Sequence, residues 1–283
     1  MPRKELEEEY AAVYSGFDSP LIQKVRSEAF EEDIGQHSWV TADELRDYLH
    51  WLKLASSGHF LDFGCGPAGP LTYIAKHTQA RATGIDINAA ALESAQRRVA
   101  QMGLDEQVCL QRMNEDQAVP YGSNIFDAVV SIDVVMHLPD RSRIFAELCR
   151  VIVPSGCFLF TDACIVNGPL SDEDIRIRSH YGMSHFVPDG FNEATLNAAG
   201  FELVKKEVRT QGLVAICRGR HKTREKYKKE LICDFGAEAF EHEQCYLKKL
   251  VDLYSNQTLL RYVYLAKKTW ENDQSNSCPT SKQ

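Results

Sequence analysis

The residues with the clearest chemical pattern are the closely spaced glycines of the segment GCGPAG at 64–69. This segment matches the pattern G-x-G-x-x-G, and Asp86 follows 22 residues after Gly64. Glycines let a ligand approach the backbone closely, and an acidic residue at this distance can bind ribose hydroxyls. Because an apolar stretch precedes the segment and a helical pattern follows it, the sequence predicts a site for a nucleoside cofactor.

Asp62 discriminates between cofactors. It stands two positions before Gly64, where a dinucleotide would rest its pyrophosphate on the loop and the helix N-terminus. A carboxylate there would repel the pyrophosphate by about 3 kcal/mol at ~5–6 Å and an effective dielectric constant near 20. S-adenosylmethionine reverses the sign, since it carries a sulfonium and an ammonium group and no phosphate. The sequence therefore favours S-adenosylmethionine over a nicotinamide dinucleotide.

The elements around these residues alternate regularly. Apolar stretches at 59–64, 81–87, 106–113, 124–135 and 156–165 predict strands, and helical patterns lie at 70–78, 88–103 and 140–152. Strands that are apolar on both faces, most of them followed by a helix, are typical of a parallel sheet covered on both sides. We predict a doubly wound α/β fold whose ligands bind at the carboxyl ends of the strands.

The remaining segments are expected to cover that core. Helices are predicted in the first 57 residues, including one whose cap is Ser38 or Thr41, with Glu44 three residues after Thr41. A polar and aromatic stretch at 171–190 is expected to form a lid. A short helix at 191–200 and a strand from 201 follow. Two long helices, broken near 233–236, are predicted before a last strand near 259–268, and the tail at 271–283 is expected to be disordered.

As a set, these motifs resemble the class I S-adenosylmethionine-dependent methyltransferases. LDFGCGPAG, GIDIN, FDAVVSIDVVMHLPD and NAAGFELV match the motifs of that family in order and spacing, over about residues 58–210. Ala68 departs from the family, which often has glycine there, and we expect little effect. The resemblance implies a Rossmann-like, seven-stranded sheet. On this basis we expect a single domain: an N-terminal helical cap at 1–57, a core at 58–210 and 259–268, and a helical insertion at 211–258.

The resemblance also implies roles for individual residues. Asp62, Gly64, Cys65 and Gly66 would bind the methionine end of the cofactor. Asp86 would bind the ribose, and Ile87 would pack on the adenine. The segment 114–116 lies where the family contacts the adenine amino group, with Asp116 slightly preferred, and the backbone near Asp133 would face the cofactor.

The methyl acceptor is less clear from the residues. His137 follows the fourth predicted strand, so it would lie at the active end of the sheet as a base or orienting group; a capping or core-edge histidine is the other interpretation. SIDVVMHL and FTDACI are similar to segments of the N-methyltransferases that act on phosphoethanolamine and on glycine-type amines. The chain departs from the phosphobase enzymes at Gln36, His37 and Ala163, which disfavours phosphoethanolamine as the acceptor.

Aromatic residues and histidines in the covering segments are candidate substrate contacts. Those we single out are His37, Trp39, His180 and Tyr181. Aromatic faces stabilise an ammonium group by roughly 0.5–2 kcal/mol each when desolvated. The basic run at 218–230 is interleaved with glutamates and is interpreted as a solvated helix face.

Composition limits the remaining alternatives. The 283 residues carry a net charge of −8, which disfavours a general nucleic-acid binder. No apolar run is long enough for a membrane span or a signal peptide, and nine scattered cysteines without a CxxC pair predict reduced thiols and no metal site. We expect a cytoplasmic enzyme, monomeric or homodimeric, that acts on a small molecule.

Nitrogen is therefore the first acceptor hypothesis. Transfer to oxygen or carbon of a secondary metabolite is the alternative within the same class, because only the lid would need to differ. An NAD-dependent oxidoreductase and a catalytically silent cofactor-binding protein are the alternatives from other classes, and Asp62 and His137 argue against them.

Overall fold

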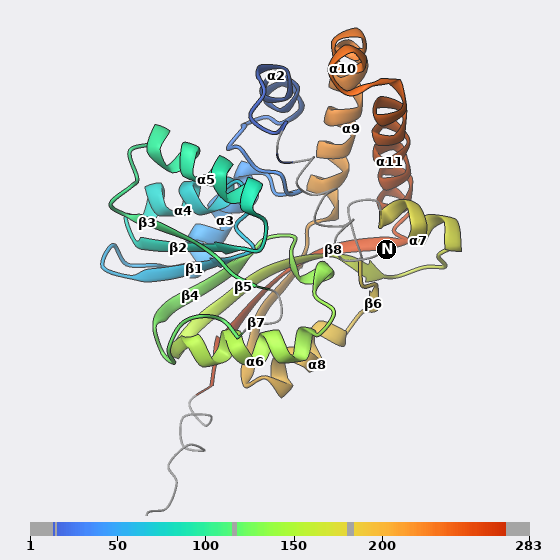
Figure 1. The fold of residues 1–283 in the computed structure, drawn as a ribbon. Coiled ribbons are helices and arrows are strands. Elements are labelled where there is room, and N and C mark those ends of the chain that lie inside the picture. Colours follow the sequence, from blue (N-terminus) through green and yellow to red (C-terminus); the bar gives the residue numbers. More distant parts are fainter. Residues whose placement is uncertain (1–13, 15, 115–117, 180–183, 270–283) are drawn as a thin grey trace, which may run out of the picture.

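A twisted sheet organises the computed structural model, which describes residue 14 and residues 16–114, 118–179 and 184–269 (Figure 1). The strands are β1 (His59–Phe63), β2 (Arg81–Asp86), β3 (Val108–Arg112), β4 (Phe126–Ser131), β5 (Ile152–Val166), β6 (Val187–Pro188), β7 (Phe201–Val208) and β8 (Leu259–Lys268). The order is β3-β2-β1-β4-β5-β8-β7, with β6 paired to β5. The strands run parallel except β8, which is antiparallel to β5 and β7.

Helices cover both faces of this sheet, as predicted. They are α2 (Pro20–Ala29), α3 (Ala42–Leu52), α4 (Gly69–Thr78), α5 (Ala89–Gln101), α6 (Arg141–Val151), α7 (Asp172–Arg178), α8 (Phe191–Ala198), α9 (Thr210–Lys226), α10 (Lys228–Phe235) and α11 (Ala237–Ser255), with a 3-10 helix, η1 (Val135–His137). Figure 1 shows α4 and α5 on the opposite side of the sheet from α6 and α8. One buried apolar cluster fills each of these two layers. The doubly wound α/β prediction is thereby confirmed.

The strand prediction differs from the structure in the number of strands and in the bounds of the fourth and fifth, since β5 begins at Ile152 rather than at 156. Seven strands form the continuous path, and within the described residues the two-residue β6 adds an eighth. The predicted fourth strand at 124–135 is longer than the observed β4. β4 ends at Ser131, and the chain turns at Asp133, which adopts a left-handed conformation with φ of 56°, before entering η1. Hydrophobic composition therefore continues past the end of the strand.

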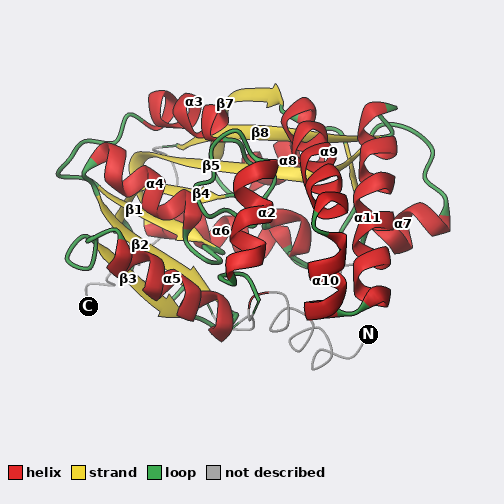
Figure 2. Ribbon diagram, turned by 90° about the horizontal axis from the view of Figure 1, so that it is seen from above, coloured by secondary structure: helices red, strands yellow, loops and turns green. Residues whose placement is uncertain are grey.

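The insertion before β8 contains three helices instead of the predicted two. The break at 233–236 is confirmed, since α10 and α11 meet at Gly236, and a further break lies at Tyr227. Figures 1 and 2 show α9, α10 and α11 side by side at one end of the sheet. A third apolar cluster joins α9 and α11 to Trp39 and Met136. The insertion therefore packs onto the edge where the parallel strands end.

The stretch at 35–39 of the N-terminal segment lies between the glycine loop and this insertion, since Gly35 contacts Gly69 and Trp39 packs near Tyr246 of α11. Thr41 caps α3 in a capping box with Glu44, as predicted. Gly69, the first residue of α4, packs directly on the segment at 35–36: a Cβ at Gly69 would lie 2.6 Å from the carbonyl carbon and oxygen of Gly35. On α5, Arg98 Nε donates to the Pro67 carbonyl at 3.1 Å. This segment is therefore fixed against the loop.

Candidate active site

A cavity of about 790 Å³ opens at the carboxyl ends of β1, β2 and β4. These strands flank the point where the sheet order reverses, because β2 and β3 lie on one side of β1 and β4 and β5 on the other. Ligands bind at such points in open α/β sheets. The glycine loop and the residues around Asp86 line one part of the cavity, and η1, α7, α9 and α11 contribute side chains to the other.

The glycine loop is held in a conformation that needs its glycines. Gly64 and Gly66 have φ of 78° and 52°, in the left-handed region that favours glycine. A Cβ at Gly64 would lie 2.5 Å from a methyl carbon of Val134, which follows β4. Ala68 also has a left-handed φ of 61°, so alanine replaces glycine here at a cost of roughly 1 kcal/mol in backbone strain. Cys65 is buried beside the loop.

Asp62, the last but one residue of β1, is a buried carboxyl group in the cavity wall. Its side chain is 2% exposed, and Oδ2 has no hydrogen-bond partner within the described residues. Burial, reinforced by the neighbouring Asp86 carboxylate, raises the pKa of Asp62 to about 8. A buried acid in this situation gains from a cation placed beside it.

Asp86 stands at the end of β2, where its carboxylate binds two backbone amides. Oδ2 accepts from Gly66 N and Oδ1 from Asn88 N, both at 2.8 Å. These bonds fix the side chain between the glycine loop and the start of α5, while each oxygen retains a lone pair for a ligand hydroxyl. Ile87, next along the chain, lines the same cavity and is 46% exposed. Both positions suit the roles predicted for them, which stay predictions.

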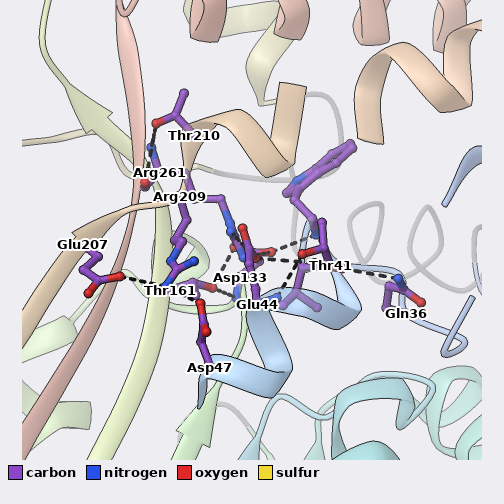
Figure 3. Close-up of polar contacts among 12 residues, drawn as sticks. Gln36, Thr41, Glu44, Asp47, Asp133, Thr161, Glu207, Arg209, Thr210 and Arg261 are labelled. Carbon is purple, nitrogen blue, oxygen red and sulfur yellow. Dashed lines mark hydrogen bonds and ion pairs between the residues drawn. The ribbon is translucent and has the colours of Figure 1, made fainter. Parts of the chain in front are cut away.

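Asp133 also lines the cavity, but the protein itself uses its carboxylate (Figure 3). Oδ1 accepts from Arg261 Nε at 2.9 Å and from Thr161 Oγ1 at 2.8 Å. Oδ2 accepts from Trp39 N at 2.8 Å. Arg261 also donates to Glu44 Oε2 at 2.8 Å. The side chain of Asp133 therefore ties the end of β4 to the N-terminal segment, and its backbone N–H donates to Thr161 Oγ1 at 2.7 Å; the predicted role of its backbone toward a cofactor stays a prediction.

His137 occupies the end of η1, directly after β4. Its side chain is half-buried and lines the cavity, and its backbone N–H closes the short helix by donating to the Val134 carbonyl at 2.8 Å. The sharp turn at Asp133 thus directs the segment back over the sheet edge. His137 thus lies in the cavity wall after β4, and its role as base stays a prediction.

His37 and Trp39 extend the cavity wall from the N-terminal segment. Burial, together with the nearby Arg220 cation, lowers the pKa of His37 to about 4. His37 is therefore neutral at physiological pH. The Trp39 ring lies 6.4 Å from that of Tyr246, and the Arg220 guanidinium carbon lies 5.1 Å from the centre of the Trp39 ring. Aromatic and cationic side chains thus share this end of the cavity.

Sequence reasoning missed Arg178, Arg220 and Tyr246 as cavity residues. Arg220 belongs to the basic run that was interpreted as a solvated face. In the structure, its guanidinium group pairs with Glu243 of α11 at 3.1 Å, within the helical insertion. The sequence around Arg220 does not indicate that it faces the cavity, because α11, which carries Glu243, meets α9 only in the tertiary structure. Asp116, His180 and Tyr181 lie outside the described residues.

Comparison with known proteins places these features in a family. Residues 61–160 match a family model described as "Methyltransferase domain", and this stretch contains the glycine loop, Asp86 and His137. This stretch is therefore similar to the methyltransferase domains of the class I, S-adenosylmethionine-dependent family that the sequence motifs resemble. S-adenosylmethionine is the cofactor of that family, and the buried Asp62 with its unsatisfied oxygen fits the cofactor's positive charge.

Relatives of the methyltransferase domain act on different acceptors. A sterol 24-C-methyltransferase of Aspergillus fumigatus is 30% identical over 64% of this chain and 48% of its own length. A phosphoethanolamine N-methyltransferase of Triticum aestivum is 26% identical over 69% of this chain and 38% of its own. This chain thus spans about half of the sterol enzyme and less of the wheat enzyme.

Solved structures share the fold of the methyltransferase domain. A Haemonchus contortus phosphoethanolamine N-methyltransferase in complex with phosphomonomethylethanolamine and S-adenosylhomocysteine superposes with a TM-score of 0.76 at 19% identity, over 90% of this chain and 57% of that chain. The [4+2]-cyclase SpnF superposes with a TM-score of 0.70 at 21% identity, over 89% of this chain and 93% of that chain. The fold therefore serves more than one chemistry.

Membrane-spanning helices and metal-binding clusters are both absent from the described residues. In the residues that it describes, no helix is long and apolar enough to cross a membrane. No group of three or more histidine, cysteine or acidic side chains is placed to hold a metal ion in the same part of the chain. The eight cysteines in that part form no disulfide bond.

Proposed function

We propose that this protein transfers a methyl group from S-adenosylmethionine to a small-molecule acceptor. The observation that carries the proposal is the buried carboxyl group of Asp62, unsatisfied at Oδ2 and lying in the cavity wall. A dinucleotide would bring its phosphate charge to the loop that follows this acid and further disfavour its ionisation, whereas a sulfonium or ammonium group would stabilise the ionised carboxylate. Electrostatics therefore supports S-adenosylmethionine against NAD.

The cofactor's two ends would be held by different parts of the cavity. Asp62 with the loop at 64–66 would hold the methionine end, where close backbone approach is possible. Asp86 would accept the ribose hydroxyls, because its carboxylate is already oriented by two amides. The exposed face of Ile87 would pack on the adenine. When bound, the cofactor supplies an electrophilic methyl group on sulfur.

An amine nitrogen is our first choice of acceptor. In-line displacement needs the nucleophile held in line with the methyl group and water excluded. His137 would orient the amine and accept its proton. Trp39 and Tyr246, 6% and 2% exposed, would shield that end of the cavity from water. The neutral His37 offers a further hydrogen-bond acceptor there.

Calorimetry with S-adenosylhomocysteine and with NAD tests the cofactor assignment. We expect S-adenosylhomocysteine to bind and NAD not to bind; micromolar NAD affinity would refute the proposal. Asp86→Ala should weaken S-adenosylhomocysteine binding by about tenfold or more, the value of one or more hydrogen bonds to a charged group. Asn124→Ala, away from the cavity, serves as the control and should leave the affinity unchanged.

The second candidate is transfer to carbon or oxygen of a larger metabolite. The similarity to sterol 24-C-methyltransferases favours carbon, as does the apolar wall near Trp39 and Met136. A screen of amines, amino acids, phenols and sterols with labelled S-adenosylmethionine separates the two candidates. We also propose a single domain in a cytoplasmic monomer or homodimer, to be tested by size-exclusion chromatography with light scattering and by fractionation.

A further inference from the structure

Arg178 is a buried cation in the wall of the active-site cavity. It ends α7, is 2% exposed and lines the cavity beside Met136. Its Nη2 lies 3.3 Å from the sulfur of Met136, the residue that directly precedes His137 in the sequence. The guanidinium group is therefore close to the segment that carries the proposed base, at the acceptor end of the cavity.

The partners of Arg178 among the described residues are neutral. Nε donates to the Tyr254 hydroxyl at 3.0 Å, and Tyr254 in turn donates to the Ala163 carbonyl. Within the described residues, Nη1 has no hydrogen-bond partner and no carboxylate lies within ion-pair distance of the side chain. The guanidinium is thus held in a fixed position by the protein while its charge is not neutralised.

The other buried arginines provide an internal comparison. Within the described residues, buried arginines stand at four positions, and three of them are paired with a carboxylate. The pairs are Arg26 with Asp33 at 2.9 Å, Arg141 with Asp162 at 2.7 Å, and Arg261 with Asp133 at 2.9 Å and Glu44 at 2.8 Å. Arg178 departs from this pattern. Burying a charge without a counter-charge is costly, so this position calls for an anion that the described residues do not supply.

A second polar group lies in the same wall. The Ser184 hydroxyl is buried and lines the cavity, and apart from a weak contact with the Cys164 thiol it has no hydrogen-bond partner within the described residues. A hydroxyl can donate to an anionic oxygen. Together, a guanidinium fork and a hydroxyl match the geometry of a carboxylate or a phosphate.

We propose that the methyl acceptor carries an anionic group, a carboxylate or a phosphate, and that Arg178 binds it. This inference rests on the proposed function, because it places the acceptor beside His137. An acceptor that is an amine at one end and an anion at the other would be held by Arg178 while its nitrogen is presented to His137. The sequence departures from the phosphobase enzymes leave open which anion it is.

The test measures binding of inorganic phosphate and of acetate by calorimetry, with and without saturating S-adenosylhomocysteine. We expect one of the two anions to bind the unmodified protein. Arg178→Met should weaken that binding by at least about tenfold, the value of a charged hydrogen bond, and Arg178→Lys should weaken it less. The matched control is Arg218→Met, an exposed arginine on α9 whose partner is Ser255, and it should change nothing.

Thermal unfolding supplies a readout that is independent of methyl transfer. Without ligand, Arg178→Met should melt at the same temperature as the unmodified protein or higher, because it removes an uncompensated charge. Arg141→Met should melt lower, because it strands Asp162. Equal anion affinity in the unmodified protein and in Arg178→Met, or no binding of either anion, would overturn the proposal. Anion binding without methyl transfer to any acceptor would instead overturn the proposed function and leave the anion site standing.

Discussion

Replacing Arg261 with methionine should destabilise this protein severely. Arg261 comes from β8, is fully buried, and neutralises Asp133 at the end of β4 and Glu44 on α3 (Figure 3). Methionine has a similar length and would keep most of the packing. The substitution would leave two buried carboxylates, Asp133 and Glu44, without their cation. The loss of stability therefore comes from uncompensated charge rather than from a cavity.

The magnitude follows from the pairing. Removing one partner of a buried ion pair costs about 3–5 kcal/mol, because the remaining charge stays desolvated. For a chain of this size, that corresponds to a melting temperature lower by at least about 6 °C. Urea unfolding followed by circular dichroism measures the free energy of unfolding directly. Arg218→Met is the control, and its loss should stay below about 0.5 kcal/mol, as expected for a surface substitution.

The pH dependence provides a further check. The unmodified Arg261 cation holds the pKa of Asp133 below its ordinary value despite complete burial. Without that cation, burial should raise the pKa of Asp133. A raised pKa means a penalty that is present at neutral pH and disappears as the pH falls and the acid is protonated. The deficit of Arg261→Met should therefore shrink toward pH 5, and adding Glu44→Gln and Asp133→Asn should recover part of it at pH 7. A loss below about 1 kcal/mol at pH 7 would refute the reasoning.

The other predictions concern the cofactor site, the contact of the glycine loop with the N-terminal segment, and His137. S-adenosylhomocysteine affinity should rise about tenfold per pH unit from pH 6 toward 8 and then level off, because its ammonium group requires ionised Asp62, whose pKa is about 8; Asp62→Asn should remove this slope in calorimetry. Gly69→Ala should cost about 1–3 kcal/mol in unfolding free energy and weaken cofactor binding, since its Cβ would meet the Gly35 backbone at 2.6 Å; Gly122→Ala, whose Cβ would make only an ordinary contact with the Ile125 side chain at 3.9 Å, should not. His137→Ala should lower turnover at least about a hundredfold and leave S-adenosylhomocysteine affinity unchanged; unchanged turnover would make His137 structural.

The cofactor half of the site was predictable from the sequence because its residues are close along the chain. The glycine loop, Asp62 and Asp86 follow consecutive strands, and parallel strands bring their carboxyl ends to one edge. The capping box at Thr41 was predictable for the same reason, since it is a contact within one helical turn. Local spacing and strand order were enough for these positions, and the structure places them together.

The acceptor half was decided by tertiary structure. Arg178, Arg220 and Tyr246 come from α7, α9 and α11, and helical periodicity says which face of each helix is apolar but not which helix it will meet. The pairing of Arg261 with Asp133 joins residues 128 positions apart, and in the sequence Arg261 is one polar residue in an apolar strand. Sequence by itself determined the α/β fold and the position of the cofactor loop. Only the packing of the helical insertion over the sheet edge decided which charges face the acceptor and which of them the protein neutralises.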